Sequence, residues 1–213
     1  IDPLHSDTLY AGTIGDGVLK SVDKGNTWKG VNKGLISKNI KDKSLVIDPS
    51  NPEILYAVGG ISLFLKGKGV FKTTNGGGNW KEINRGLVKN VESLAINPED
   101  TDILYAGTHY GGVFKTTNGG DRWFKLEDSP HDVENLSLAV DNLNPDVIYV
   151  GTFGDGVFMS RDAGRSWTGL NTGLTDLSVF TLKIDPIHPS TIYAGALRFT
   201  HAFDNIIAAP NPD

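Results

Sequence analysis

One pattern recurs five times along the 213 residues and constrains the fold more than any other feature. Each full copy has an apolar strand, a second strand with a phrase such as Tyr-Ala-Gly-Thr, a third reading Gly-Val-Phe-Lys, and a glycine-rich turn that closes on tryptophan. Repeats of about this length, built from short strands and glycine turns, are typical of β-propeller blades. The matching tyrosines are Tyr10, Tyr56, Tyr105, Tyr149 and Tyr193, and the four tryptophans are Trp28, Trp80, Trp123 and Trp167, spaced 52, 43 and 44 residues apart.

The length accommodates about five repeats in one domain. We therefore predict a single all-β propeller domain over residues 1–213, built from four-stranded antiparallel blades. Five blades are expected, with part of a larger six- to eight-bladed propeller as the alternative. The blade repeats fall at about 1–34, 43–84, 91–127, 135–170 and 178–213.

Composition and charge argue against several kinds of partner. The net charge is −5 and the lysines are scattered among acids, so no basic stripe is available for nucleic acid. No apolar run is long enough to insert into a membrane. The chain has no cysteine, which excludes disulfides and thiolate chemistry. The absence of cysteine fits either an exported or a cytosolic protein, so the localisation is left open, with a secreted or periplasmic one favoured. The sequence begins at Ile1 without an initiator methionine, which suggests a processed or trimmed chain.

The third repeat shows how one blade is expected to fold. Its four strands are predicted at Val91–Ile96, Ile103–Thr108, Gly112–Thr116 and Trp123–Leu126. A meander of this kind cannot bury both faces of its sheet alone, so each blade must stack on its neighbours. We expect the recurring tyrosines and tryptophans to fill the wedges between blades.

The turn before each tryptophan carries a short polar side chain at one fixed position. Asp23 and Asp162 occupy it in the first and fourth copies, and Asn75 and Asn118 in the middle copies. Such a side chain accepts hydrogen bonds from backbone N–H groups just ahead of it, while the glycine permits positive φ. We interpret these turns, with their tryptophans, as structural rather than ligand-binding.

The turns resemble the Asp-box, Ser-x-Asp-x-Gly-x-Thr-Trp, of BNR-repeat propellers. Families with this repeat include sialidases, xyloglucan-hydrolysing glycoside hydrolases, sortilin-like receptors and photosystem II assembly factors. The Tyr-Ala-Gly-Thr and Asn-x-Gly-Leu phrases of this chain are most similar to those of the xyloglucanases and the assembly factors. The resemblance implies the propeller fold, and either glycan hydrolysis or ligand binding.

Propeller geometry places the loops between second and third strands on the face opposite these turns, where a ligand site is expected. Asp16 and Asp155 share one position in two blades, either as a carboxylate pair for glycoside cleavage or as ordinary Gly-Asp-Gly turns. An expanded loop at 59–69 carries apolar side chains that either pack on a neighbouring blade or bind a partner. The candidate ligand-binding residues on this face are His109, Tyr110, Phe64, Phe153 and Arg198.

The sequence lacks residues that several classes of enzyme require. Resemblance to sialidases implies three arginines around the substrate, whereas three of the five here, Arg122, Arg161 and Arg165, lie in the turns before tryptophan. The xyloglucanases that the chain resembles bind substrate between two propellers. The histidines show no metal-site spacing, so we predict no transition metal and no cofactor, with calcium left open.

The fifth copy departs from the pattern after Tyr193. Its tryptophan position falls at Asn211, and the tail from Asn205 resembles the start of another repeat. We expect Asn205 to Ala209 to add an innermost strand to the first blade and so close the ring. The sequence thus favours a non-catalytic propeller that binds a glycan or protein ligand, with a xyloglucanase-like glycoside hydrolase using Asp16 and Asp155 as the alternative. The oligomeric state is left open.

Overall fold

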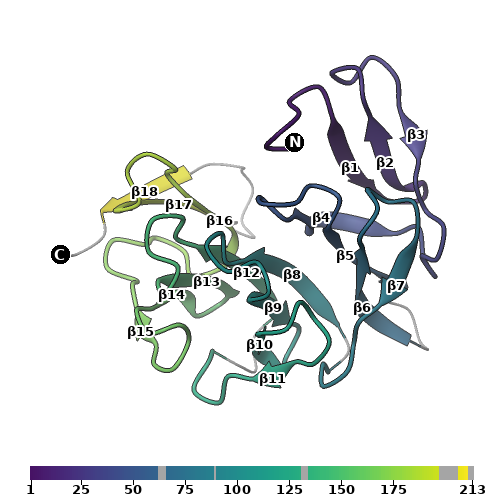
Figure 1. Ribbon diagram of the computed structural model, residues 1–213. Helices are drawn as coiled ribbons and strands as arrows, with labels where there is room; N and C mark the ends of the chain where they lie inside the picture. The colour runs from purple at the N-terminus through teal and green to yellow at the C-terminus, as the bar shows by residue number, and fades with distance from the viewer. Residues whose placement is uncertain (62–65, 89, 131–133, 197–205, 211–213) are drawn as a thin grey trace.

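The computed structural model describes residues 1–61, 66–88, 90–130, 134–196 and 206–210, which form five antiparallel sheets arranged as a fan (Figure 1). None of these residues lies in a helix, in agreement with the predicted all-β fold. Within the same ranges the chain accordingly offers no helix that could cross a membrane. Three sheets have four strands, and the two at the ends of the fan have three.

We number the sheets 1 to 5 in chain order. Their strands are β1 (Leu9–Thr13), β2 (Gly17–Ser21) and β3 (Lys29–Gly30) in sheet 1; β4 (Ile40–Ile47), β5 (Leu55–Ile61), β6 (Lys66–Thr73) and β7 (Trp80–Glu82) in sheet 2; β8 (Val91–Ile96), β9 (Leu104–Thr108), β10 (Gly112–Thr116) and β11 (Phe124–Lys125) in sheet 3; β12 (Glu134–Val140), β13 (Ile148–Phe153), β14 (Gly156–Ser160) and β15 (Thr168–Gly169) in sheet 4; and β16 (Val179–Ile184), β17 (Thr191–Ala196) and β18 (Ile206–Pro210) in sheet 5.

The strands predicted for the third repeat are found within a residue or two of their expected bounds. Alternation along β9 explains why this sheet is buried on both faces. Leu104 and Ala106 point toward sheet 2, while Tyr105 points toward sheet 4, and each is at most 1% exposed. We call the face toward the preceding sheet the leading face and the face toward the following sheet the trailing face.

Four hydrophobic clusters fill the four seams between consecutive sheets. Phe71 and Trp80 of sheet 2 pack with Val18 of sheet 1, and Phe114 and Trp123 of sheet 3 pack with sheet 2. The expectation that tryptophans fill wedges between blades is thus confirmed for Trp80 and Trp123, which are 2% and 1% exposed. Each seam buries large apolar side chains, which is the main favourable term in stacking such sheets.

The tryptophans also bind the preceding sheet through their indole nitrogens. Nε1 of Trp80 donates to the carbonyl of Val31 at 2.7 Å, and Nε1 of Trp123 donates to the carbonyl of Ile83 at 2.9 Å. No sheet precedes Trp28 among the described residues; its Nε1 donates to the carbonyl of Gly25 in its own turn, and the side chain is 43% exposed. The first tryptophan therefore differs from the wedge role expected for it.

The tail does not form the expected innermost strand of the first blade. Strand β18 instead pairs antiparallel with β17, with Ala208 opposite Tyr193, which is the place of a third strand in sheet 5. Strand β1 stays at the edge of sheet 1, in the order β1-β2-β3. The predicted closure is therefore wrong, because the third-strand position beside β17 takes the same residues. Figure 1 shows sheets 1 and 5 at the two ends of the fan.

Candidate functional site

The loops that join second and third strands lie at one end of the sheets, which we call the loop face (residues 14–16, 109–111 and 154–155 among those described). Two of them, in sheets 1 and 4, contact the link that enters the next sheet. Gly15 donates to the carbonyl of Lys38, and Gly154 donates to the carbonyl of Leu177, both at 3.0 Å. These backbone bonds hold the two loops in fixed positions.

A recurring asparagine clamps the start of the third strand on the loop face. Asn32 Oδ1 accepts the Val18 N–H at 2.7 Å while its Nδ2 donates to the carbonyl of Asp16 at 2.7 Å. Asn171 does the same for Val157 and Asp155, at 2.8 and 2.9 Å. A side chain at Gly17 or Gly156 would collide with these amides, which explains the glycine after each aspartate.

Sequence reasoning missed this clamp. The asparagine belongs to the Asn-x-Gly-Leu phrase, and its constant spacing of 14 residues from the valine of the third strand is the signal that could have identified the clamp. Sheet 3 replaces it with Ser129, whose hydroxyl accepts the Val113 N–H at 3.0 Å. The clamp therefore depends on an acceptor at this place rather than on asparagine itself.

Asp16 and Asp155 are both exposed at the tips of their Gly-Asp-Gly turns. The clamp fixes the backbone of each turn, so both carboxylates project from rigid positions on the loop face. They belong to sheets 1 and 4, which are separated by sheets 2 and 3. The two candidate acids thus share a register and a face but come from sheets that are not neighbours.

His109 and Tyr110 form an aromatic pair at the loop of sheet 3. Their rings meet edge to face with centroids 4.3 Å apart, and the backbone N–H of His109 donates to the carbonyl of Asn90 at 2.9 Å. Tyr110 has a φ of 61° and is 53% exposed. A left-handed backbone is uncommon for a residue of this size. The Nδ1 atom of His109 is buried with no hydrogen-bond partner among the described residues.

Phe153 lies at the loop of sheet 4 and packs against Phe180 of strand β16. Their rings meet edge to face at 5.4 Å, and both side chains are partly exposed. A bridge between Phe153 and Ser178 ties this loop to sheet 5. The loop face therefore carries a second aromatic pair, beside the turn that holds Asp155. Phe64 and Arg198 lie outside the described residues.

The opposite end of the sheets carries the four turns that precede tryptophan, and we call it the turn end. In sheet 1 the Asp23 carboxylate accepts the backbone N–H of Thr27 at 2.9 Å and hydroxyls of Thr27 and Ser21 at 2.6 and 2.7 Å. Asn75 and Asn118 accept equivalent bonds in sheets 2 and 3. These local bonds confirm the predicted geometry of the turns.

The same bonds shift the acidity of the two aspartates. Hydrogen bonds from the side chain and backbone of Thr27, then from Ser21, lower the pKa of Asp23 to about 2. Bonds from Ser166 and Ser160 hold the pKa of Asp162 below its ordinary range. Both carboxylates stay ionised at neutral pH, engaged within their own turns.

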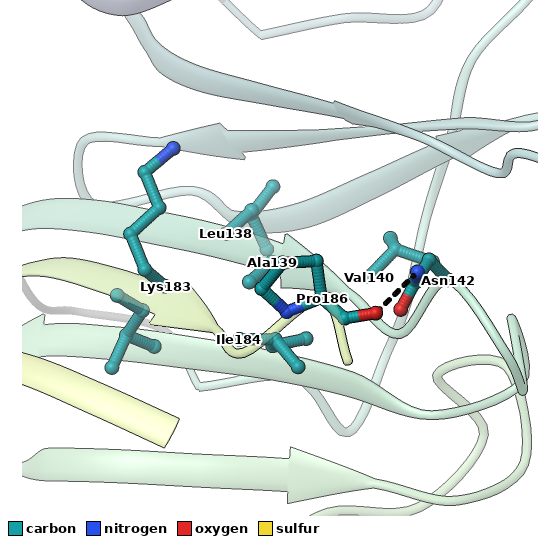
Figure 2. A pocket seen from close by; sticks show the side chains of 8 residues that line it. Leu138, Ala139, Val140, Asn142, Lys183, Ile184 and Pro186 are labelled. Atoms are coloured by element: carbon teal, nitrogen blue, oxygen red, sulfur yellow. Dashed lines mark hydrogen bonds between the residues drawn. The ribbon is translucent and has the colours of Figure 1, made fainter. Parts of the chain in front are cut away.

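A cavity of about 290 Å³ opens between the inner strands β12 and β16 (Figure 2). A hydrogen bond from Asn142 Nδ2 to the carbonyl of Pro186, 3.2 Å long, spans one end of it. Lys183 is its one charged lining residue. The cavity therefore has no carboxylate for acid or base catalysis, and it includes none of the loop-face candidates. Across the described ranges, no group of three or more His, Asp or Glu side chains is placed to hold a metal ion.

Comparison with known proteins identifies a common fold. No family model matches the chain. A probable oligoxyloglucan-reducing end-specific xyloglucanase from Neosartorya fischeri is 28% identical over 109 residues, which make up 50% of this chain and 13% of that protein. The chain thus spans a small part of this relative.

Solved structures agree on the architecture. A GH74 xyloglucanase from Xanthomonas campestris superposes with a TM-score of 0.76 at 19% identity, covering 91% of this chain and 32% of that one. The GH74 enzyme of Niastella koreensis gives 0.75 at 21% identity, with 92% and 32% covered. YCF48 from Cyanidioschyzon merolae gives 0.63 at 13% identity, with 88% and 60% covered. The chain therefore has the β-propeller architecture of these proteins and spans about a third of the two GH74 enzymes.

Proposed function

We propose that this chain is a glycan-binding propeller segment whose loop face holds a β-glucan of the xyloglucan type without cleaving it. The observation that carries the proposal is the pair of aromatic clusters on that face, His109 with Tyr110 and Phe153 with Phe180. Flat aromatic rings present apolar area at little entropic cost and suit the apolar faces of sugar rings.

The rigidity of the loops supports the same role. The asparagine clamp and the bonds from Gly15 and Gly154 fix the loop backbones before any ligand arrives. A preorganised surface loses less entropy on binding. The similarity to xyloglucanases supports this ligand class, and the local hydrogen bonds of the turns before tryptophan support assigning them as Asp-boxes.

Isothermal titration with xyloglucan oligosaccharides tests the proposal. Tyr110→Ala and Phe153→Ala should each weaken binding about tenfold, or about 1.4 kcal/mol. Phe124→Ala is the matched control, because Phe124 is also 53% exposed but lies on the outermost strand of sheet 3. Equal losses in all three variants, or no binding by the unmodified chain, would contradict the proposal; pull-down by a protein instead would favour the other ligand class.

Hydrolysis is the second candidate, and one observation favours it: Asp16 and Asp155 project from identically clamped turns. Glycosidases use two carboxylates, one as acid and one as base or nucleophile. Reducing-end release from xyloglucan should be measured for the unmodified chain and for Asp16→Asn and Asp155→Asn. Turnover that either change abolishes would replace the binding-only proposal.

A further inference from the structure

The two asparagines of the turns before tryptophan are each followed directly by glycine. Asn75-Gly76 and Asn118-Gly119 are the only such pairs in the sequence. Both asparagine residues are exposed, whereas both glycines are buried. Asparagine is a chemically labile residue, and a following glycine favours loss of its side-chain amide because glycine has no side chain to hinder attack by its own backbone nitrogen. The turn end therefore carries two pairs with the same latent chemistry.

This chemistry needs no reactant besides water. The backbone nitrogen of Gly76 gives up its proton and bonds to Cγ of Asn75, and the bond from Cγ to Nδ2 breaks, so that ammonia leaves and a cyclic imide remains. Water then opens the imide at one of its carbonyl carbons. If the new bond to Cγ breaks, the product is aspartate; if the original peptide bond breaks, the product is isoaspartate, whose main chain runs through the former side chain. The same steps apply to Asn118 and Gly119.

The folded turn already uses the nitrogen that would attack. Gly76 N donates to the carbonyl of Glu53, and Gly119 N donates to the carbonyl of Asp102, both at 2.9 Å. Each acceptor lies in the turn that joins the first two strands of the same sheet. A buried N–H exchanges such a bond for another only when its segment opens, because an unpaired buried donor is costly.

The asparagine side chain is held in place as well. Asn75 Oδ1 accepts the hydroxyl of Thr73 and the backbone N–H of Asn79, both at 2.9 Å. In sheet 3 the hydroxyl of Thr116 donates to Asn118 at 2.8 Å. The two threonines are at most 1% exposed, so these donors stay in fixed positions. Cγ can approach the glycine nitrogen freely only after these bonds break.

We propose that Asn75 and Asn118 are latent deamidation sites, which the folded turns keep unreactive and which become reactive when sheet 2 or sheet 3 opens locally. The aspartate product places a carboxylate where Asp23 and Asp162 already accept the same turn bonds in sheets 1 and 4. The isoaspartate product does not fit, because its longer main chain displaces the donors of the turn. The modification is irreversible and so marks each chain whose turn has opened. It belongs to the turn end and is independent of any glycan on the loop face.

Peptide mass spectrometry after incubation at mildly alkaline pH, with and without urea, tests the proposal. We expect both sites in the folded chain to lose ammonia about tenfold more slowly than in the unfolded chain, or more slowly still. Asn75→Asp provides the reference peptide that separates aspartate from isoaspartate by retention time. Equal rates in the folded and unfolded chains, or a faster reaction in the folded chain, would overturn the proposal.

Valine in place of either threonine tests the role of the hydroxyl, and each site serves as the control for the other. Thr73→Val should accelerate the reaction of Asn75 about tenfold in folded protein and leave Asn118 unchanged, because only the turn of sheet 2 loses its donor. Thr116→Val should reverse this preference. Global unfolding accelerates both sites, so the ratio of the two rates identifies a local effect. An unchanged ratio in both folded variants contradicts the protection by the turn; if a variant does not fold, the comparison with and without urea still decides.

Gly76→Ala tests the attacking group. Alanine is tolerated at this position in sheet 4, where Ala163 has a φ of 56°, and a methyl group at Gly76 meets only the ends of the Glu53 and Lys20 side chains. In urea we expect this variant to slow the reaction of Asn75 about tenfold, because the methyl group hinders the backbone nitrogen, and to leave Asn118 unchanged. Loss of ammonia from Asn75 at an unaltered rate would show that the reaction does not pass through that nitrogen.

Discussion

Two of the four turns before tryptophan carry aspartate and two carry asparagine, with nearly the same hydrogen bonds. Asp23 and Asp162 add one bond that Asn75 and Asn118 do not show, because their second carboxylate oxygen accepts the hydroxyl of Thr27 or Ser166. Both oxygens are used, so protonation of these carboxylates at low pH removes acceptors that the folded turn needs.

Acid sensitivity should therefore follow the aspartates. The folded pKa of Asp23 is about 2, below its ordinary value of 3.8, so its stabilising contribution is present above about pH 4 and is lost as pH falls toward 2. The shift for Asp162 has the same sign. We expect Asp23→Asn/Asp162→Asn to lose less stability than the unmodified chain over this range, measured as urea midpoints from about pH 5 to about pH 2.

The reverse exchange provides the control. Asn75→Asp/Asn118→Asp should steepen the loss of stability over the same range, because two more carboxylates then need to stay ionised. Parallel pH profiles for all three proteins would show that these turns do not govern acid unfolding.

At the scale of a strand pair, the seams differ in one hydrogen bond. Trp167 is the fourth-sheet counterpart of Trp80 and Trp123, but its Nε1 is buried with no partner among the described residues. The carbonyl that it would reach belongs to Leu126, and that carbonyl already accepts the N–H and hydroxyl of Ser129, at 3.1 and 2.6 Å. The same serine that replaces the asparagine clamp of sheet 3 thus removes the acceptor of the indole.

Replacing Trp123 and Trp167 by phenylalanine, one at a time, tests whether the indole hydrogen bond stabilises a seam. Trp123→Phe leaves the Ile83 carbonyl without its donor, whereas Trp167→Phe removes a donor that is already unsatisfied. Loss of ring volume is common to both, so we expect Trp123→Phe to destabilise the chain by about 1–3 kcal/mol more than Trp167→Phe. Urea unfolding at neutral pH measures the difference, and equal costs would mean that the indole bonds contribute nothing.

Individual elements could be predicted where one local rule decided the outcome. Apolar alternation and glycine turns predicted the strands of the third repeat, and the bounds of β9 and β10 agree with that prediction to within one residue. The tail could not be assigned this way. Asn205 to Ala209 fits an inner strand as well as a third strand, and the choice depends on which neighbouring edge is nearer in space. Similarly, the clamp made by Asn32 depends on a contact between strands that periodicity does not encode.

On the scale of the whole molecule, the hydrophobic clusters of the described residues cover sheets 2 to 4 on both faces and sheets 1 and 5 on one. Local stability should follow this difference, because opening free energies depend on buried apolar contacts. In dilute protein we expect amides of β1 and β17 to exchange with deuterium faster than those of β5, β9 and β13. Hydrogen exchange read by mass spectrometry checks the order; uniform protection along the chain would contradict it.

The sequence predicted the face on which the candidate site lies but not the contacts among its residues. Sequence placed Asp16, Asp155, Tyr110 and Phe153 together on one end of the sheets, and the strand order agrees. It did not anticipate that Tyr110 adopts a positive φ or that Phe153 pairs with Phe180 of the next sheet. Such contacts arise only once the sheets are stacked, because they join segments from separate repeats.

The sameness of the seams also bears on how a chain of this kind can change in length. Sheets 1, 2 and 4 each bring their own tryptophan, tyrosine and linking glycine, so a duplicate of one of these blades inserted beside its parent would meet neighbours that already fit it. No matching substitution on the far side is required for the insertion to pack. Duplication or deletion of a blade can therefore change the length of such an array one unit at a time. Single residues, such as Ser129 in place of the asparagine, can be substituted without a change in the arrangement of the blades.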